Sequence, residues 1–253
     1  MKNALYTALN AFTFGRGIQK HISGFTLNIP TRYHRFFNSN YELNNINFIN
    51  NNLEEGMVVV DVGAHIGLLS VIISQKIGNT GKVYSFEPTP STFSILKKTI
   101  KINKKGNTII PINKAVSHKS GIADFYVTDI AAHNSNSLSN NHRNYGNEHK
   151  IEVGLTSIDE LKTEFNIPKI HMIKIDAEGA ELSVLKGSIE AIEEFRPKII
   201  LALHPSSIVN YGTTLNEIWA FVKSHHYSVY YKNVEITKDF FITQKDLFDV
   251  FLI

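Results

Sequence analysis

The sequence contains no cysteine among its 253 residues. This absence excludes disulfide scaffolds, cysteine-ligated zinc sites, iron–sulfur clusters and thiol nucleophiles. Eleven histidines and 23 acidic residues leave a site of histidine and carboxylate ligands open in principle. We assign no metal-binding residue, and whether a divalent metal assists the function stays open.

Long hydrophobic runs are also missing: none approaches the roughly 18 residues that a membrane span needs. The mildly apolar stretch 4–14 is interrupted by polar residues and does not resemble a signal peptide, so we expect a cytoplasmic protein. The net charge of +3 is small, which argues against a nucleic-acid partner. A hydrophobic content of 43% with 19% charged residues suits a packed globule rather than a disordered chain.

From residue 57 onward, short β-branched segments alternate with segments of helical periodicity. The expected core strands are 57–62, 82–87, 108–112, 170–176 and 198–203, and the helices between and after them are 66–77, 91–103, 180–185 and 216–224. Further strands, antiparallel, are expected at 122–127, 227–231 and 248–253. This alternation predicts one α/β domain over residues 53–253, with a doubly wound sheet and helices on both faces.

Two segments depart from this pattern. Residues 1–52 are irregular, asparagine-rich and scattered with aromatics, and we expect a helical or mixed lid that packs on the core. Residues 131–150 hold few apolar side chains and predict a mobile insert. The insert is either a solvated loop or a cover over a substrate.

A glycine turn follows the first core strand. Asp61 ends the strand, and Gly63 and Gly67 let a ligand approach the backbone at the start of the next helix. The G-x-x-x-G spacing differs from the G-x-G-x-x-G of dinucleotide sites. Because a carboxylate at this point would repel a pyrophosphate and attract a cationic amine, the turn favours S-adenosylmethionine over NAD.

Glu87 ends the second core strand, 20 residues beyond Gly67 (87 − 67). An acid at this position can accept hydrogen bonds from the ribose hydroxyls of an adenosyl group. The alternative is a charge that only stabilises the N-terminus of the following helix.

A charged cluster follows the fourth core strand. Lys174 needs a partner if it is buried, and Asp176, Glu178 or Glu181 could supply it. The cluster is either a structural salt-bridge network or a group of acids that faces the substrate. His204, at the end of the fifth core strand, is a candidate base, since an unperturbed imidazole accepts a proton near neutral pH.

Together, these motifs resemble the FkbM family of S-adenosylmethionine-dependent methyltransferases. The likeness covers roughly residues 30 to 205. It is carried by Val59–Gly67, Gly81–Pro88, Ala115–Ser117 with Gly121, Lys174–Glu181 and Leu185–Gly187, preceded by Tyr41-Glu42. The family often has asparagine at the position of His65 and glutamate at that of Ala202.

The resemblance implies a class I methyltransferase fold, with a Rossmann-like, mostly parallel seven-stranded sheet and an antiparallel last strand. It also implies O-methylation of a hydroxyl on a sugar, a glycan or polysaccharide, or a natural product, with S-adenosyl-L-methionine as cofactor. By the resemblance, Asp61, Gly63, Ala64 and Gly67 hold the amino-acid portion of the cofactor, Glu87 holds the ribose, Ala115 and Val116 lie near the adenine, and Asp176 and Glu178 face the reacting centre. From their positions in the sequence we add Pro88, Asp176 and His65 as cofactor-binding candidates, although His65 could instead cap the helix. The catalytic candidates are Asp176, Glu178 and His204, with His204 or Asp176 as the base.

Two other functions stay open from the residues alone. One is a nucleotide-dependent oxidoreductase of the NAD type on the same architecture, against which the glycine spacing argues. The other is a non-catalytic cofactor-binding protein, against which the retained acids at 61, 87, 176 and 178 argue. The sequence gives no indication of the oligomeric state.

Overall fold

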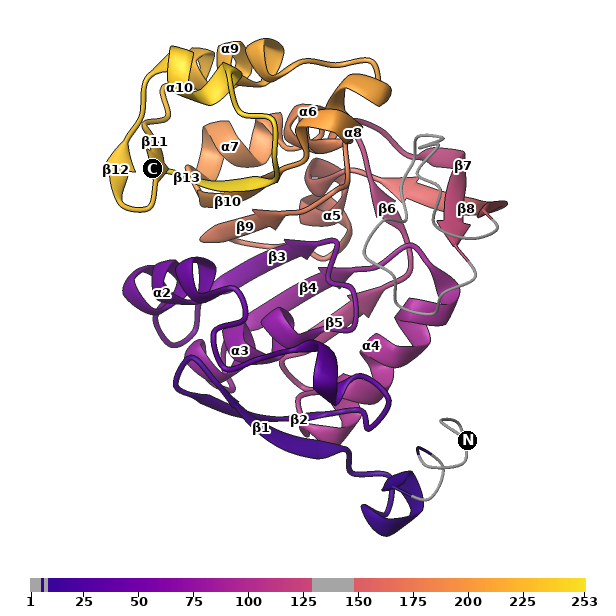
Figure 1. Ribbon diagram of the computed structural model, residues 1–253. Helices are drawn as coiled ribbons and strands as arrows, with labels where there is room; N and C mark the ends of the chain where they lie inside the picture. The colour runs from indigo at the N-terminus through magenta and orange to yellow at the C-terminus, as the bar shows by residue number, and fades with distance from the viewer. Residues whose placement is uncertain (1–5, 7–8, 129–147) are drawn as a thin grey trace.

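The computed structural model describes residue 6 and residues 9–128 and 148–253 (Figure 1). An eight-stranded sheet forms its centre, with the strand order β5-β4-β3-β9-β10-β13-β11-β12. The strands are β3 (Val58–Val62), β4 (Lys82–Phe86), β5 (Ile109–Ile112), β9 (Met172–Ile175), β10 (Lys198–Leu203), β11 (Val229–Tyr231), β12 (Val234–Glu235) and β13 (Phe248–Leu252).

Strands β5, β4, β3, β9 and β10 pair in parallel, whereas β13 runs antiparallel to both β10 and β11. The predicted α/β class and mostly parallel sheet are therefore confirmed, including the reversed last strand. The central sheet has eight strands rather than the expected seven. The additional strand is β12, which has two residues and pairs with β11 in a tight hairpin at the edge of the sheet.

Helices cover both faces of this sheet (Figure 1). They are α2 (Leu43–Asn52), α3 (Leu68–Lys76), α4 (Pro90–Ile102), α5 (Ile158–Glu164), α6 (Glu181–Lys186), α7 (Ile189–Phe195), α8 (Pro205–Asn210), α9 (Leu215–Ser224) and α10 (Lys238–Ile242), with a short 3-10 turn at His34–Phe36.

Side-chain alternation along the strands separates two cores. In β3, Val60 and Val62 pack with α5, α6, α7 and α9, whereas Val59 packs on the opposite face with α2, α3 and α4. Asp61 and Lys174 share the face of Val59, because each stands at an alternate position of its strand. The sheet thus carries its buried charges on the side of α3.

The N-terminal segment joins the second of these cores. It forms a hairpin of β1 (Ile18–Ile22) and β2 (Phe25–Ile29), followed by α2. Phe37 and Phe48 are buried, whereas Phe12, Phe14 and Phe36 are 84%, 87% and 69% exposed, so only some of the aromatics in this segment pack on the core.

A separate three-stranded sheet lies beside β5. It consists of β6 (Ala115–Val116), β7 (Gly121–Thr128) and β8 (Glu148–Thr156), in the order β6-β8-β7. The predicted insert 131–150 is corrected at its end, since residues 148–150 belong to β8 and pair with 126–128 of β7. Residues 131–147 lie outside the described part of the chain.

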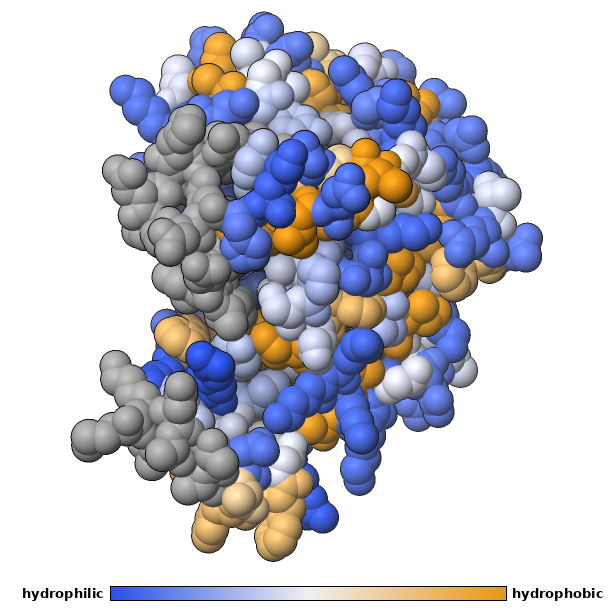
Figure 2. Space-filling model, turned by 90° about the vertical axis from the view of Figure 1, so that its right-hand side faces the viewer, coloured by the Kyte–Doolittle hydropathy of each residue, from blue (hydrophilic) through white to orange (hydrophobic). Residues whose placement is uncertain are grey.

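Figure 2 shows the face of the molecule that lies on the right-hand side of Figure 1. This face is mainly hydrophilic, with small, separate hydrophobic patches. Among the residues that the structure describes, no helix is both long and apolar enough to span a membrane.

The turn after β3 lies directly against the end of β9. Gly63 has φ +74°, and a Cβ atom built on it would lie 2.0 Å from the carbonyl oxygen of Asp176. Only glycine satisfies both the left-handed backbone and this contact with a neighbouring main chain.

We therefore expect Gly63→Ala to destabilise the protein by well over the roughly 1–2 kcal/mol that left-handed strain alone costs. Gly24→Ala is the matched control, because Gly24 has φ +89° but an added Cβ would meet nothing within 4 Å. Denaturant unfolding of both variants measures the difference. Equal losses of unfolding free energy in the two variants would show that the contact between residue 63 and Asp176 does not affect stability.

Candidate active site

One cavity of about 500 Å³ opens at the carboxyl ends of the parallel strands. This is the edge at which ligands bind in open α/β sheets. It brings together all twelve candidate residues from the sequence: Asp61, Gly63, Ala64, His65, Gly67, Glu87, Pro88, Ala115, Val116, Asp176, Glu178 and His204. Residues from five separate segments of the chain therefore share one space.

The glycine turn and Glu87 hold each other in place. The main-chain N–H of Ala64 donates to the carbonyl of Phe86 (2.8 Å), and that of His65 donates to Glu87 Oε2 (3.1 Å). The second oxygen of Glu87 accepts from the N–H of Thr89 (2.9 Å). The tips of β3 and β4 thus form one connected rim of the cavity.

Glu87 is only 6% exposed. Burial raises the pKa of this carboxyl to about 7, against the opposing effect of the hydrogen bonds from Thr89 and His65 and the charge of Lys174. Its charge therefore changes close to neutral pH.

Asp61 and Lys174 stand side by side on β3 and β9. Asp61 is fully buried and accepts a hydrogen bond from Ser70 Oγ (2.5 Å), which in turn accepts one from Ser85 Oγ (2.9 Å). Its Oδ1 lies 3.9 Å from Lys174 Nζ. Burial raises the pKa of Asp61, and Lys174 opposes this shift.

Of the three partners suggested for Lys174, Asp176 makes the ion pair (3.1 Å), and the carbonyl of Gly63 also accepts from Nζ (3.3 Å). Burial alone would lower the pKa of Lys174, but Asp176 and Asp61 raise it above its ordinary value. Although burial favours the neutral acid at Asp176, the charges of Lys174 and His204 hold its pKa below the usual range.

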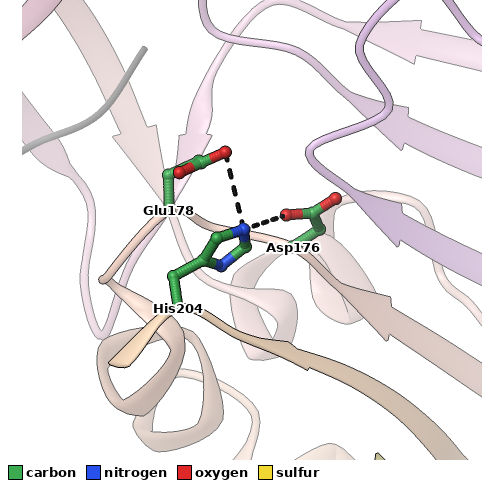
Figure 3. A group of neighbouring side chains, drawn as sticks. All are labelled: Asp176, Glu178 and His204. Carbon is green, nitrogen blue, oxygen red and sulfur yellow. Dashed lines mark ion pairs between the residues drawn. The ribbon is translucent and has the colours of Figure 1, made fainter. Parts of the chain in front are cut away.

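Glu178 and Glu181 contact His204 instead. His204 Nδ1 lies 3.0 Å from Glu181 Oε1, and Nε2 lies 3.5 Å from both Asp176 Oδ1 and Glu178 Oε1 (Figure 3). Burial lowers the pKa of His204, but the hydrogen bond to Glu181 and the surrounding carboxylates outweigh it and raise the pKa to about 9. The expectation of an unperturbed imidazole is therefore wrong.

Several polar lining residues were given no role by the sequence, among them Glu42, Asn45 and Asp249. Asn45 Nδ2 donates to Glu42 Oε2 (3.2 Å) and to Asp249 Oδ2 (2.9 Å), and Tyr41 lies beside them in the cavity wall. Tyr41-Glu42 was part of the resemblance, but Asn45 and Asp249 lie 204 residues apart and carry no local signal of a shared site.

Comparison with known proteins identifies the family of the chain. The model of the methyltransferase FkbM domain matches residues 61–229, which is more than half of the chain. The chain belongs to the FkbM methyltransferase family. The resemblance expected from the motifs is confirmed, and the matched range contains every candidate site residue.

Two curated relatives show the range of the similarity. The hexuronic acid methyltransferase AglP of Haloferax volcanii is 34% identical over 151 residues, which cover 60% of this chain and 57% of AglP. Methyltransferase sdnD of Sordaria araneosa is 25% identical over 183 residues, which cover 62% of this chain and 70% of sdnD. This chain thus aligns with a little over half of AglP.

A solved structure supports the fold. A Clostridium thermocellum protein described as an rRNA methylase matches with a TM-score of 0.52 at 10% identity, over 83% of this chain and 92% of that one. At this identity the similarity shows the class I methyltransferase architecture alone.

For this FkbM-family domain, we expect Lys174→Met to lower the free energy of unfolding by about 3–5 kcal/mol, because it leaves buried carboxylates without their cation. Lys150→Met is the control, since Lys150 pairs with Asp124 at the surface, with side chains 56% and 50% exposed; such a pair contributes about 1 kcal/mol or less. Urea denaturation measures both. A loss for Lys174→Met no greater than the control's would contradict the assigned role.

Proposed function

We propose that this chain is an S-adenosylmethionine-dependent O-methyltransferase that methylates a hydroxyl group of a sugar or a related polyol. The observation that carries the proposal is the single cavity in which the glycine turn and Glu87 adjoin the cluster of Asp176, Glu178 and His204. Membership of the FkbM family and the similarity to AglP support it.

The residues present fit this cofactor. The cavity, about 500 Å³, is within the range of small-molecule sites. Glu87 offers a carboxylate to the ribose hydroxyls, Asp61 stands beneath the turn of Gly63 and Gly67, and Ala115 with Val116 provides apolar surface for the adenine. Asp61 Oδ1 is buried, makes no hydrogen bond with the described residues and lies 3.9 Å from Lys174 Nζ, so it places negative charge beneath the turn.

The chain's own groups would align the acceptor. S-adenosylmethionine supplies an electrophilic methyl group, and transfer requires an oxygen placed in line behind it. Asp176 and Glu178 stand at the end of the cavity beside the turn and can accept hydrogen bonds from the acceptor hydroxyl. Lys174 fixes the far oxygen of Asp176, so that its Oδ1 remains directed toward His204.

The lining favours a neutral acceptor. Seven carboxylates line the cavity, against three lysines, Lys114, Lys174 and Lys245, of which Lys174 is committed to Asp176 and the Gly63 carbonyl. Hydroxyl groups donate hydrogen bonds to carboxylates, whereas the carboxylate of an acidic sugar would be repelled. We therefore infer a polyol or neutral sugar rather than the hexuronic acid for which AglP is named.

We expect S-adenosylhomocysteine to bind more tightly as the pH rises through about 7. Ribose hydroxyls donate to the ionised form of Glu87, and burial raises the pKa of that carboxyl to about 7. Folding has the opposite dependence: a raised carboxyl pKa costs stability as the pH rises from the unfolded value toward 7. Calorimetry from pH 6 to 8 measures the affinity.

The control for this dependence is Glu87→Gln, which cannot ionise and should bind more weakly with a flatter pH profile. A wild-type affinity that is constant over the same range would contradict the role of Glu87 at the ribose.

The decisive assay combines labelled S-adenosylmethionine with a panel of neutral sugars, polyols and uronic acids. We expect methyl transfer to neutral hydroxyl acceptors. Glu178→Gln should lower kcat by about 10²-fold or more, the scale of a lost proton-handling group, while the S-adenosylhomocysteine Kd changes less than about threefold. Failure to bind S-adenosylhomocysteine, with NADH bound instead, would establish the oxidoreductase alternative.

A further inference from the structure

Three side chains that line the cavity point toward one another (Figure 3). Asp176 and Glu178 come from the loop between β9 and α6, and His204 stands at the tip of β10, the neighbouring strand. One ligand atom from each lies within 4.8 Å of the other two. His204 is 6% exposed, and the side chains of Glu178 and Asp176 are 15% and 32% exposed.

The spacing is wider than that of hydrogen-bond partners. A charge-assisted N–H···O bond is about 2.7–2.9 Å long, whereas His204 Nε2 lies 3.5 Å from each carboxylate. In an octahedral site with bonds of about 2.1 Å, neighbouring ligand atoms are about 3 Å apart and opposite ones about 4.2 Å. The two separations of 3.5 Å lie between these values, so a small ion fits among the three ligand atoms.

Glu181 supplies an independent observation from outside the cluster. It is fully buried, accepts a hydrogen bond from the N–H of Gly179 (3.0 Å), and lies 3.0 Å from His204 Nδ1. When Nδ1 donates to this carboxylate, the Nε2 lone pair faces Asp176 and Glu178. A histidine that binds a metal commonly donates its other ring N–H to a carboxylate in this way.

The charges favour a divalent cation. A metal that binds at Nε2 displaces the proton there, after which the two carboxylates and the neutral imidazole leave a charge of −2 at the three ligand atoms, while Lys174 bonds the other oxygen of Asp176. We propose that Asp176, Glu178 and His204 bind a divalent metal ion of the Mn²⁺ or Mg²⁺ class, oriented by Glu181. Oxygen ligands with one imidazole and no sulfur suit Mn²⁺ well.

The role of this ion rests on the proposed function. A metal ion held by these three residues would adjoin the cavity that they line and could bind the acceptor hydroxyl there. Coordination makes that hydroxyl more acidic: its proton leaves to solvent, the oxygen–methyl bond forms and the sulfur–methyl bond breaks. Metal binding itself does not require the methyl transfer.

The test is a titration of the EDTA-treated full chain with Mn²⁺ alone, followed by the loss of the free-ion electron paramagnetic resonance signal. We expect one site per chain. Glu178→Gln and His204→Asn should weaken Mn²⁺ binding at least tenfold, and Glu181→Gln by about 10- to 100-fold, the usual effect of a group that orients a ligand. Circular dichroism confirms that each variant is folded.

Glu194→Gln is the control, because Glu194 is an exposed carboxylate that pairs with Lys162 away from the cavity; it should bind Mn²⁺ as the wild type does. An absence of binding by the wild type at millimolar Mn²⁺, or equal binding by all the variants, would overturn the metal site. S-adenosylhomocysteine calorimetry in EDTA tests the proposed function separately. Methyl transfer that persists in EDTA would support the methyltransferase function but would show that the reaction does not need the metal.

Discussion

The site depends on the ion pairs and hydrogen bonds that balance the charge of one buried cation, Lys174. Lys174 lies inside β9, 4% exposed, and isolated burial of an ammonium group would be prohibitively costly. Its Nζ bonds Asp176 and the carbonyl of Gly63 and approaches Asp61, so it connects the tips of β3 and β9. Without Lys174, the carboxylates of Asp61 and Asp176 would repel each other across two neighbouring strands.

This arrangement follows from the alternation of side chains along strands. Asp61 and Lys174 are paired in register on one face of the sheet, while Ile173 and Ile175 pack into the opposite core. The polar face is then completed by α3, whose Ser70 bonds Asp61. One face of a central sheet thus accommodates charge because each member has a partner at hydrogen-bond or ion-pair distance.

The sequence predicted those parts of the fold that local patterns determine. The β-branched strand 57–62 and the strand 198–203 agree with β3 and β10 to within a residue, because glycines flank the first and prolines flank the second. The whole of β8 was missed; its first residues, 148–150, are polar and form a strand only through pairing with β7.

The candidate site was predictable only where its residues belong to short motifs. The glycine turn and Glu87 are such motifs, and they line one cavity. The raised pKa of His204 was not predictable, because it depends on Glu178 and Glu181, which come from another strand tip. Likewise, the bond between Asn45 and Asp249 joins segments 204 residues apart. When polar residues that are far apart in the chain meet in the fold, no periodic pattern in a single sequence indicates their contact.

The distance between the two halves of the site is set by main chain rather than by mobile side chains. Gly63 of the cofactor turn packs against the carbonyl of Asp176, so close that a single Cβ would not fit between them. Glu87, at the end of β4, accepts a hydrogen bond from the N–H of His65 in the same turn. In the proposed function, in-line transfer loses rate steeply when the reacting atoms are displaced by about 1 Å, so this direct contact would give the glycine a role in alignment. A larger residue at 63 would separate the glycine turn from Asp176 and so from the proposed acceptor side of the cavity.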